Sequence, residues 1–156
     1  MEGIDRRQFL KESAVTVVVT STCLCGFSGC ATFTKIGDAP AITPEALSQK
    51  GKDLVIDLSK EPILSQVGGA VKIRQEDIPS GIIVAHTQEN TFAIASLLCT
   101  HRGVEVEYDH KKQKFECASL GSSTYTLAGK NIGGPAEKPL QAHEATLQGT
   151  ILTIRL

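Results

Sequence analysis

The sequence predicts an all-β fold, an antiparallel sandwich or barrel of short strands. About nine short strand patterns follow one another at close spacing after residue 50, as such folds require. The chain also has 14 glycines and 6 prolines, which indicate many turns. It shows no heptad pattern and no internal repeat, so nothing favours a helical bundle.

Composition limits the classes of function. A length of 156 residues suits one domain preceded by a leader segment. Hydrophobic residues make up 41%, which is enough for a packed core and too many for a disordered chain. The 16 Lys and Arg nearly balance 17 Asp and Glu, so we expect no nucleic-acid partner. No uncharged run in the second half is long enough to cross a membrane, so only the N-terminus is expected to associate with one.

Residues 1–34 have the layout of an export signal. The stretch Asp5-Arg6-Arg7-Gln8-Phe9-Leu10-Lys11 is followed, after Glu12, by 22 uncharged residues, 13–34. The pattern R-R-x-F-L-K resembles the twin-arginine signal of bacterial export, with Asp5 where Ser or Thr is usual. The alternative is an ordinary charged N-terminus before a buried helix. The order of the arginines, Phe9-Leu10 and the uncharged run favours the signal.

Three fates of this leader fit its residues. The sequence Phe27-Ser28-Gly29-Cys30 resembles a lipobox in which Cys30 would be lipidated, with Phe27 in place of Leu. Residues 13–34 are also long enough for a single membrane anchor, although eight of them are Ser or Thr. Simple cleavage is the third fate. All three place the folded part outside the cytoplasm, in the periplasm or an equivalent compartment.

A location outside the cytoplasm affects how the cysteines are interpreted, because such compartments are often oxidising. Cys23, Cys25 and Cys30 lie in the leader, so only Cys99 and Cys117 belong to the folded region. Two cysteines in an oxidising compartment indicate first a disulfide and second a pair of metal ligands.

Residues 35–50, with Pro40 and Pro44, are predicted as a linker, and residues 51–156 as the folded domain. Within that domain, apolar and charged residues alternate over 70–74 and 104–108, which predicts half-buried strands. The other predicted strands are 54–58, 82–86, 91–95, 114–117, 145–147 and 150–154.

Two stretches separated by a hairpin-like segment carry candidate chemistry. They are Cys99-Thr100-His101-Arg102-Gly103 and Cys117-Ala118-Ser119-Leu120-Gly121-Ser122, with 15 residues between His101 and Cys117. The sequence Gly133-Gly134-Pro135-Ala136 follows downstream.

These stretches resemble the Rieske iron–sulfur family, whose pattern is C-x-H and then C-x-x-H at this spacing, with a G-P-A loop downstream. The resemblance covers roughly residues 50–156. It implies a Rieske-type antiparallel sandwich with a small cluster-binding subdomain of two loops, at about residues 97–140. It also implies a [2Fe–2S] cluster in which two thiolates hold one iron and two imidazoles hold the other, which raises the reduction potential.

The resemblance assigns roles to individual residues. Cys99 and Cys117 match the thiolate ligands, and His101 matches one imidazole ligand. Ser122 matches a serine whose hydroxyl donates toward a cluster sulfur. Tyr125 matches an aromatic residue with the same task, after a single insertion within 122–124. Gly134 and Pro135 belong to the loop that covers the cluster.

The chain departs from the family at the fourth ligand, where Leu120 stands in place of histidine. Leucine has no lone pair, so the predicted site has three ligands. A disulfide found in many members is also missing, since its two positions read Val104 and Ser119. The remaining histidines are His86, His110 and His143, and their spacing gives no reason to take any of them as the fourth ligand.

The preferred interpretation is an electron carrier. Water or a ligand from a partner would complete its cluster, beside a quinol-oxidising membrane cytochrome or a periplasmic oxidoreductase. The chain would then be an electron-transfer subunit and not an enzyme on its own. A soluble cytoplasmic ferredoxin also fits the motif spacing, but the export signal argues against it.

The alternative is a clusterless structural or interaction subunit. Leu120 would then lie on an apolar contact surface, and Cys99 and Cys117 could form a disulfide. A zinc site of Cys99, His101 and Cys117 with one open position ranks last, because no general base for hydrolysis stands nearby.

Overall fold

The computed structural model of the chain describes residues 37–120 and 122–156. Arg6, Arg7 and Cys30 lie outside the described residues, as does Gly121. The predicted signal, anchor and lipidation site therefore remain predictions. No helix in the described part of the chain has the length and hydropathy that a membrane crossing needs.

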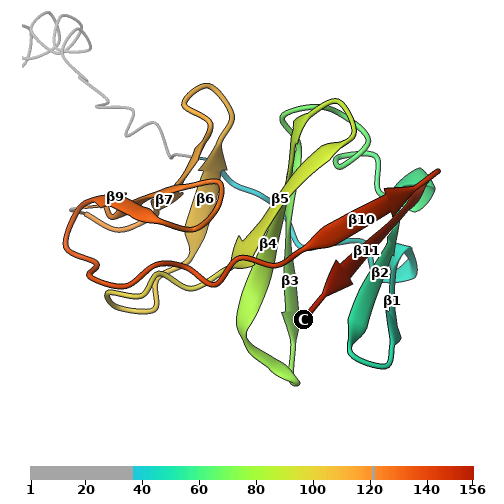
Figure 1. Cartoon of the computed structure of the whole chain (residues 1–156), viewed down its shortest axis with the longest axis horizontal. Helices are drawn as coiled ribbons and strands as arrows, with labels where there is room; N and C mark the ends of the chain where they lie inside the picture. The colour runs from blue at the N-terminus through green and yellow to red at the C-terminus, as the bar shows by residue number, and fades with distance from the viewer. Residues whose placement is uncertain (1–36, 121) are drawn as a thin grey trace, which may run out of the picture. The chain divides into compact units, whose positions relative to one another are not determined.

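The described residues form three antiparallel sheets (Figure 1), which confirms the predicted all-β class. The sheet orders are β1-β2-β11-β10, β3-β4-β5 and β6-β7-β8-β9. Two short 3-10 helices, η1 (Pro44–Ala46) and η2 (Leu58–Lys60), flank the first hairpin. The strands are β1 (Leu47–Lys50), β2 (Asp53–Asp57), β3 (Ala70–Gln75), β4 (Ile78–Gln88), β5 (Thr91–Ser96), β6 (Val106–Asp109), β7 (Lys114–Cys117), β8 (Thr124–Thr126), β9 (Asn131–Gly133), β10 (Ala145–Gln148) and β11 (Ile151–Arg155).

Strand β4 is buried on both faces, which makes the β3-β4-β5 sheet the middle layer. Ile82 and Val84 pack into a core with residues of β2 and β11. Ile83 and Ala85 point the other way, into a second core with the aromatic residues of β6, β7 and β8. A continuous apolar run is what a strand needs when both of its faces are covered.

Three strands fall where none was predicted. Leu47–Lys50 forms β1 at a sheet edge, within the stretch predicted as linker. Its side chains are mostly exposed, so the sequence there lacks the apolar alternation that marks a strand. Strands β8 and β9 have three residues each and are too short to show a period. The predicted cluster-binding subdomain at about residues 97–140 therefore contains, besides its two loops, the small sheet β6-β7-β8-β9.

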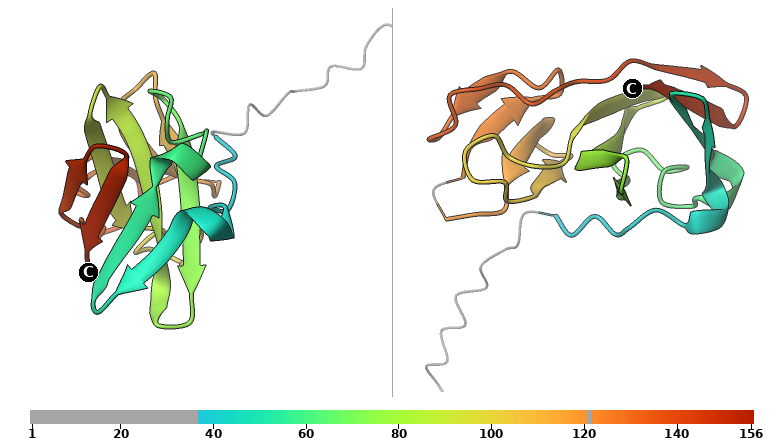
Figure 2. Two further views of the ribbon diagram at one scale, coloured as in Figure 1. Left: turned by 90° about the vertical axis from the view of Figure 1, so that its right-hand side faces the viewer. Right: turned by 90° about the horizontal axis from the view of Figure 1, so that it is seen from below.

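Residues 39–43 form an extended segment, here called the strap, that lies along β3. Ile42 N donates to Lys72 O at 2.9 Å, and Lys72 N donates to Pro40 O at 2.8 Å. At one end, Thr43 N donates to Glu61 Oε2 at 2.8 Å. At the other, Ala39 N donates to Glu107 Oε2 at 3.1 Å. Figure 2 shows this segment, in cyan, extended along the folded unit.

A buried lysine joins the strap, β3 and β6. Lys72 Nζ contacts the Glu107 carboxylate and lies 3.2 Å from Glu105 Oε2. Lys72 and Glu107 are both buried. Burial lowers the pKa of Lys72, but its hydrogen bonds and charge interactions with Glu107 and Glu105 outweigh that effect and hold the pKa above its usual value. The ammonium therefore stays charged at neutral pH.

The opposite edge of the middle sheet is also covered. Residues 141–143 run beside β5, where Ser96 N donates to Gln141 O at 2.8 Å and His143 N donates to Ile94 O at 3.0 Å. Ala95 and Ala142 form an isolated bridge between the two segments.

Candidate functional site

The loop between β5 and β6 carries Cys99 and His101. Cys99 N donates to Val104 O, and Gly103 N donates to Cys99 O, both at 2.8 Å, so the loop forms a tight turn. Gly103 has a φ of +68°, a conformation that glycine adopts without steric cost. The Cys99 side chain points into the core and is 3% exposed, whereas His101 is exposed.

The loop between β7 and β8 carries Cys117 and Leu120. Cys117 ends β7, and its N–H donates to Ser123 O at 2.9 Å across the loop. Ala118 N donates to Glu105 O at 3.0 Å, which ties this loop to the first one. Cys117 is 2% exposed and Leu120 is 96% exposed. The loop therefore directs a thiol inward and an apolar side chain outward.

The loop of Gly134, Pro135 and Ala136 packs against the second loop. Ala136 N donates to Ser123 Oγ at 3.0 Å. Gly134 has a φ of +82°, and a Cβ placed on it would lie 2.5 Å from backbone atoms of Ser122 and Ser123. Only glycine allows so close an approach. The predicted cover loop thus lies beside the cysteine-bearing loops.

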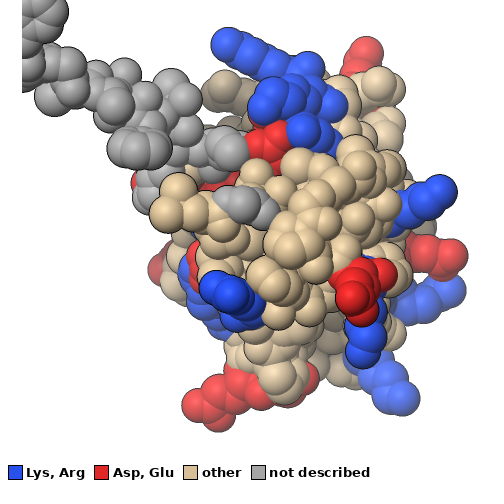
Figure 3. All heavy atoms as spheres, turned by 90° about the vertical axis from the view of Figure 1, so that its left-hand side faces the viewer, with Lys and Arg blue, Asp and Glu red and all other residues tan. Residues whose placement is uncertain are grey.

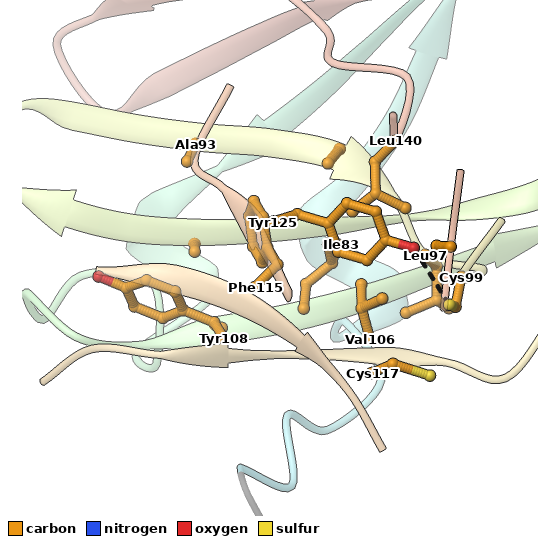
Figure 4. Packing of buried hydrophobic residues seen from close by; sticks show 14 residues of the cluster. Ile83, Ala93, Leu97, Cys99, Val106, Tyr108, Phe115, Cys117, Tyr125 and Leu140 are labelled. Atoms are coloured by element: carbon orange, nitrogen blue, oxygen red, sulfur yellow. Dashed lines mark hydrogen bonds between the residues drawn. The ribbon is translucent and has the colours of Figure 1, made fainter. Parts of the chain in front are cut away.

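The two thiols lie at the same end of one buried cluster (Figure 4). Tyr125 Oη lies 3.1 Å from Cys99 Sγ, and Ser119 Oγ lies 3.1 Å from Cys117 Sγ. Hydrogen bonding with Cys117 is also among the influences that lower the pKa of the Cys99 thiol. Both cysteines are free thiols.

The surroundings of Cys99 favour its thiolate. Burial raises the pKa of the Cys99 thiol, but hydrogen bonds from Tyr125, the His101 backbone, Cys117 and Ser123 outweigh burial and lower that pKa below its usual value. The thiolate is the form that binds metals and attacks disulfides.

Ser123 is a further residue of this site that the sequence analysis did not single out. It is buried, its hydroxyl accepts from Ala136 N at 3.0 Å, and it is among the groups whose hydrogen bonds lower the pKa of the Cys99 thiol. Ser122 is half-buried, and its donation toward a cluster sulfur stays a prediction. Side chains two residues apart on an extended chain share a face, so Ser123 and Tyr125 reach the same sulfur. The S-x-Y spacing was the signal that could have identified Ser123.

The described residues supply part of the ligand set that the family resemblance implies. Both thiols are in place, His101 lies on an exposed turn, and Leu120 offers no lone pair. Within residues 37–120 and 122–156, no three His, Cys, Asp or Glu side chains gather closely enough to hold a metal ion. The two thiols and the His101 imidazole would hold three of the four positions of a [2Fe–2S] site, and Leu120 would leave the fourth without a protein ligand.

The other histidines lie away from the two loops. His86 Nδ1 lies 2.8 Å from Leu64 O, and its ring stacks on Phe92. His110 bonds Tyr108 at the β6–β7 turn, and His143 Nδ1 lies 3.3 Å from Arg155 O. Each is held elsewhere by its own partners, so none takes the place of the missing ligand.

A Tyr125→Phe variant should lower the free energy of unfolding by about 1–2 kcal/mol, because the fully buried hydroxyl bonds both Cys99 and Thr100. The Cys99 pKa should rise toward its usual value at the same time, since this hydrogen bond lowers it. Urea unfolding and the pH dependence of thiol alkylation measure the two effects.

Tyr108→Phe is the matched control. Its hydroxyl bonds Gln113 and His110 at the edge of the hairpin, where water can replace it, so we expect a loss of roughly 0.5 kcal/mol or less. Equal losses in the two variants, with an unchanged Cys99 pKa, would contradict the assignment.

Comparison with known proteins identifies one family. The model of the family described as Rieske [2Fe-2S] domain matches residues 51–144. A search of curated proteins gives no match.

Three solved structures are among those to which this chain is similar. The cyanobacterial plasma membrane Rieske protein PetC3 from Synechocystis PCC 6803 is 20% identical, with a TM-score of 0.48 over 56% of this chain and 87% of that one. The ferredoxin of carbazole 1,9a-dioxygenase from Nocardioides aromaticivorans IC177 is 16% identical, with a TM-score of 0.49 over 58% and 86%. A chain of a hyperthermophilic respiratory Complex III is 18% identical, with a TM-score of 0.44 over 94% and 93%.

Proposed function

Because this chain belongs to the Rieske [2Fe-2S] domain family, we propose that it is a subunit of an extracytoplasmic, membrane-associated electron-transfer complex. Its proposed partners are membrane cytochrome or periplasmic oxidoreductase subunits. The twin-arginine pattern at Arg6-Arg7 supports export. The uncharged run 13–34, or lipidation at Cys30, would supply the membrane attachment.

Leu120 is the observation that carries this proposal. Leu120 is 96% exposed at a loop tip, and several exposed apolar side chains gathered on one face mark an interaction surface. Val104 and Ile132, from the adjoining loop and strand, are 36% and 55% exposed. Figure 3 views this end of the folded unit and shows uncharged side chains over the centre of the face, with charged ones mostly around its margin. The end of the folded unit that carries Leu120, Val104 and Ile132 is therefore the proposed docking surface.

We assign the chain a contact role within the complex, without a cluster of its own. The incomplete ligand set supports this assignment, since the position next to the thiols holds a leucine. A second candidate function is electron transfer through a [2Fe–2S] cluster. The intact thiol pair, with the hydroxyls of Tyr125 and Ser119 beside it, favours that candidate. It would need an imidazole or water ligand from outside the described residues.

The test is capture of the full-length chain from solubilised native membranes. We expect a haem- or flavin-containing subunit to accompany it, seen by absorption spectroscopy of the captured fraction. Leu120→Asp should reduce that recovery by at least tenfold, because a buried unpaired carboxylate opposes docking. Val67→Asp, at a residue 50% exposed and remote in sequence from the two loops, is the matched control and should not. Capture of the chain alone, or an equal loss in both variants, would contradict the docking role.

The same sample decides between the two candidate functions. Iron, acid-labile sulfide and the EPR spectrum after reduction are measured on the captured complex. Little iron attributable to this chain is the expected result. About two irons per chain with a Rieske-type signal would establish the second candidate.

A further inference from the structure

We propose that the pocket beside the start of β5, built around His86, binds a small neutral molecule with an apolar body and one hydroxyl donor, of about the size of phenol. The site is separate from the cysteine-bearing loops, because its residue Phe92 lies near the start of β5 whereas Cys99 follows the end of that strand. It is also independent of the proposed docking role.

The pocket lies at one end of the core between the middle sheet and the β1-β2-β11-β10 sheet. Its apolar wall consists of four buried or partly buried side chains of that core, Leu58, Leu64, Phe92 and Leu147. Its volume is about 240 Å³. An apolar cavity of about 150 Å³ is enough to bind benzene, so this pocket has room for one ring with a polar substituent.

A histidine occupies an inward position in this apolar layer. His86 follows Ile82 and Val84 at two-residue intervals along β4, so its side chain lies on the same face of the strand. The imidazole stacks on Phe92, its partner across the β4–β5 ladder, with ring centroids 4.4 Å apart. His86 is 8% exposed. A polar ring is therefore fixed at a position where the strand pattern predicts an apolar side chain.

One ring nitrogen of His86 is paired and the other is not. Nδ1 lies 2.8 Å from Leu64 O. Because a carbonyl oxygen can only accept, Nδ1 carries the proton and donates, which leaves Nε2 of the neutral ring as an acceptor. Nε2 is buried and has no hydrogen-bond partner among the residues that the structure describes. Few buried polar atoms of native proteins stay unpaired, so a molecule that brings a donor to Nε2 is favoured.

The other groups of the pocket restrict the ligand further. None of the described residues that line it is Asp, Glu, Lys or Arg, so a charged molecule would enter without a counter-ion. The Ser59 hydroxyl donates to Asp57 Oδ1 at 2.6 Å. The Ser65 hydroxyl donates to Leu58 O at 2.8 Å. Since neither hydroxyl supplies a proton to His86 Nε2, the donor has to come from the ligand.

The experiment titrates the full-length chain with phenol and with toluene, which has nearly the same shape but no hydrogen-bond donor. Binding is followed by NMR, through the nitrogen shifts of the His86 ring and the backbone amide signal of Phe92. We expect the His86 ring in the tautomer with the proton on Nδ1. Its Nε2 signal should move toward that of a hydrogen-bonded nitrogen with phenol but not with toluene.

His86→Asn tests the recognition group, because the amide keeps a donor for Leu64 O and removes the Nε2 acceptor. The ratio of phenol affinity to toluene affinity should fall by about tenfold, since one hydrogen bond to a buried group is lost. The ratio cancels the different tendencies of the two molecules to leave water. His143→Asn is the matched control, since His143 Nδ1 also lies near a carbonyl but outside the pocket, and it should leave both affinities unchanged. An unchanged ratio in His86→Asn would overturn the role of His86.

Leu147→Trp tests the pocket without altering His86, so the result stays decisive even where His86→Asn does not fold. Leu147 is a partly buried wall residue, and the larger side chain would occupy the space of the ligand. Both molecules should bind roughly tenfold more weakly or not at all, with an unfolding midpoint close to that of the parent. No binding of phenol to the parent at millimolar concentration, or equal binding in Leu147→Trp, would overturn the site.

Discussion

A Leu120→His variant is expected to retain iron that the parent chain does not. The change supplies an imidazole at the position where the sequence resemblance predicts the fourth ligand, on the loop that also carries Cys117. Losing even a residue that only supports a metal ligand typically weakens a site by ~10–100-fold, so restoring a ligand should raise bound iron by at least that factor. Iron and sulfide are assayed after reconstitution of the full chain, and EPR identifies the cluster type.

Leu120→His tests whether a ligand at position 120 allows iron to bind. Leu120 is almost fully exposed, so a change there leaves the core undisturbed. Leu120→Asn is the matched control, since it is polar and compact but offers no imidazole. Equal iron in the two variants would show that polarity and not ligation matters. Iron in neither would show that a side chain at this position cannot complete the site, and would contradict the expectation.

Lys72→Met is expected to lower the free energy of unfolding by about 3–5 kcal/mol. Removing one partner of a buried ion pair leaves the other charge uncompensated, and Glu107 is buried beside Lys72. The same carboxylate also accepts the Ala39 N–H, so the strap should loosen as well. Urea unfolding gives the energy, and hydrogen exchange at Ile42, whose N–H bonds Lys72 O, reports on the strap.

Lys60→Met provides the comparison. Lys60 pairs with Asp57 at 3.7 Å, and its side chain is 57% exposed, so the loss should be roughly 0–1 kcal/mol. Adding Glu107→Gln to Lys72→Met should recover part of the stability, since the amide oxygen still accepts the Ala39 N–H without leaving a buried charge. Similar losses for Lys60→Met and Lys72→Met, or no recovery in the double variant, would show that the buried pair does not act in this way.

Strands with a run of buried apolar residues were predictable from the sequence, whereas the edge strand β1 and the three-residue strands β8 and β9 were not. Strands β3, β4 and β5 place apolar residues in the cores, so their patterns were clear. Strand β1 has only one apolar residue, and its pairing with β2 is set by register across a turn. Hydropathy carries no information on such pairing, which is why the segment was predicted as linker.

The residues of the candidate site were also predicted only in part. Cys99, Cys117, Tyr125 and Gly134 were identified by motif, and the structure brings them to one end of the fold. The place of Ser123 in the site was not predicted, because it depends on a hydrogen bond from Ala136 N to Ser123 Oγ, between residues 13 apart in the chain. No single-sequence pattern records such a contact.

The strap and residues 141–143 also determine how the middle sheet can meet other proteins. Each covers one edge strand, the strap on β3 and residues 141–143 on β5, and each takes up backbone groups that an edge would otherwise present. Open edges recruit strands from other chains, which leads to aggregation or to peptide binding by strand addition. With these backbone groups taken up, the middle sheet offers little free edge for either event. A partner that contacts this sheet is then left to recognise it through side chains.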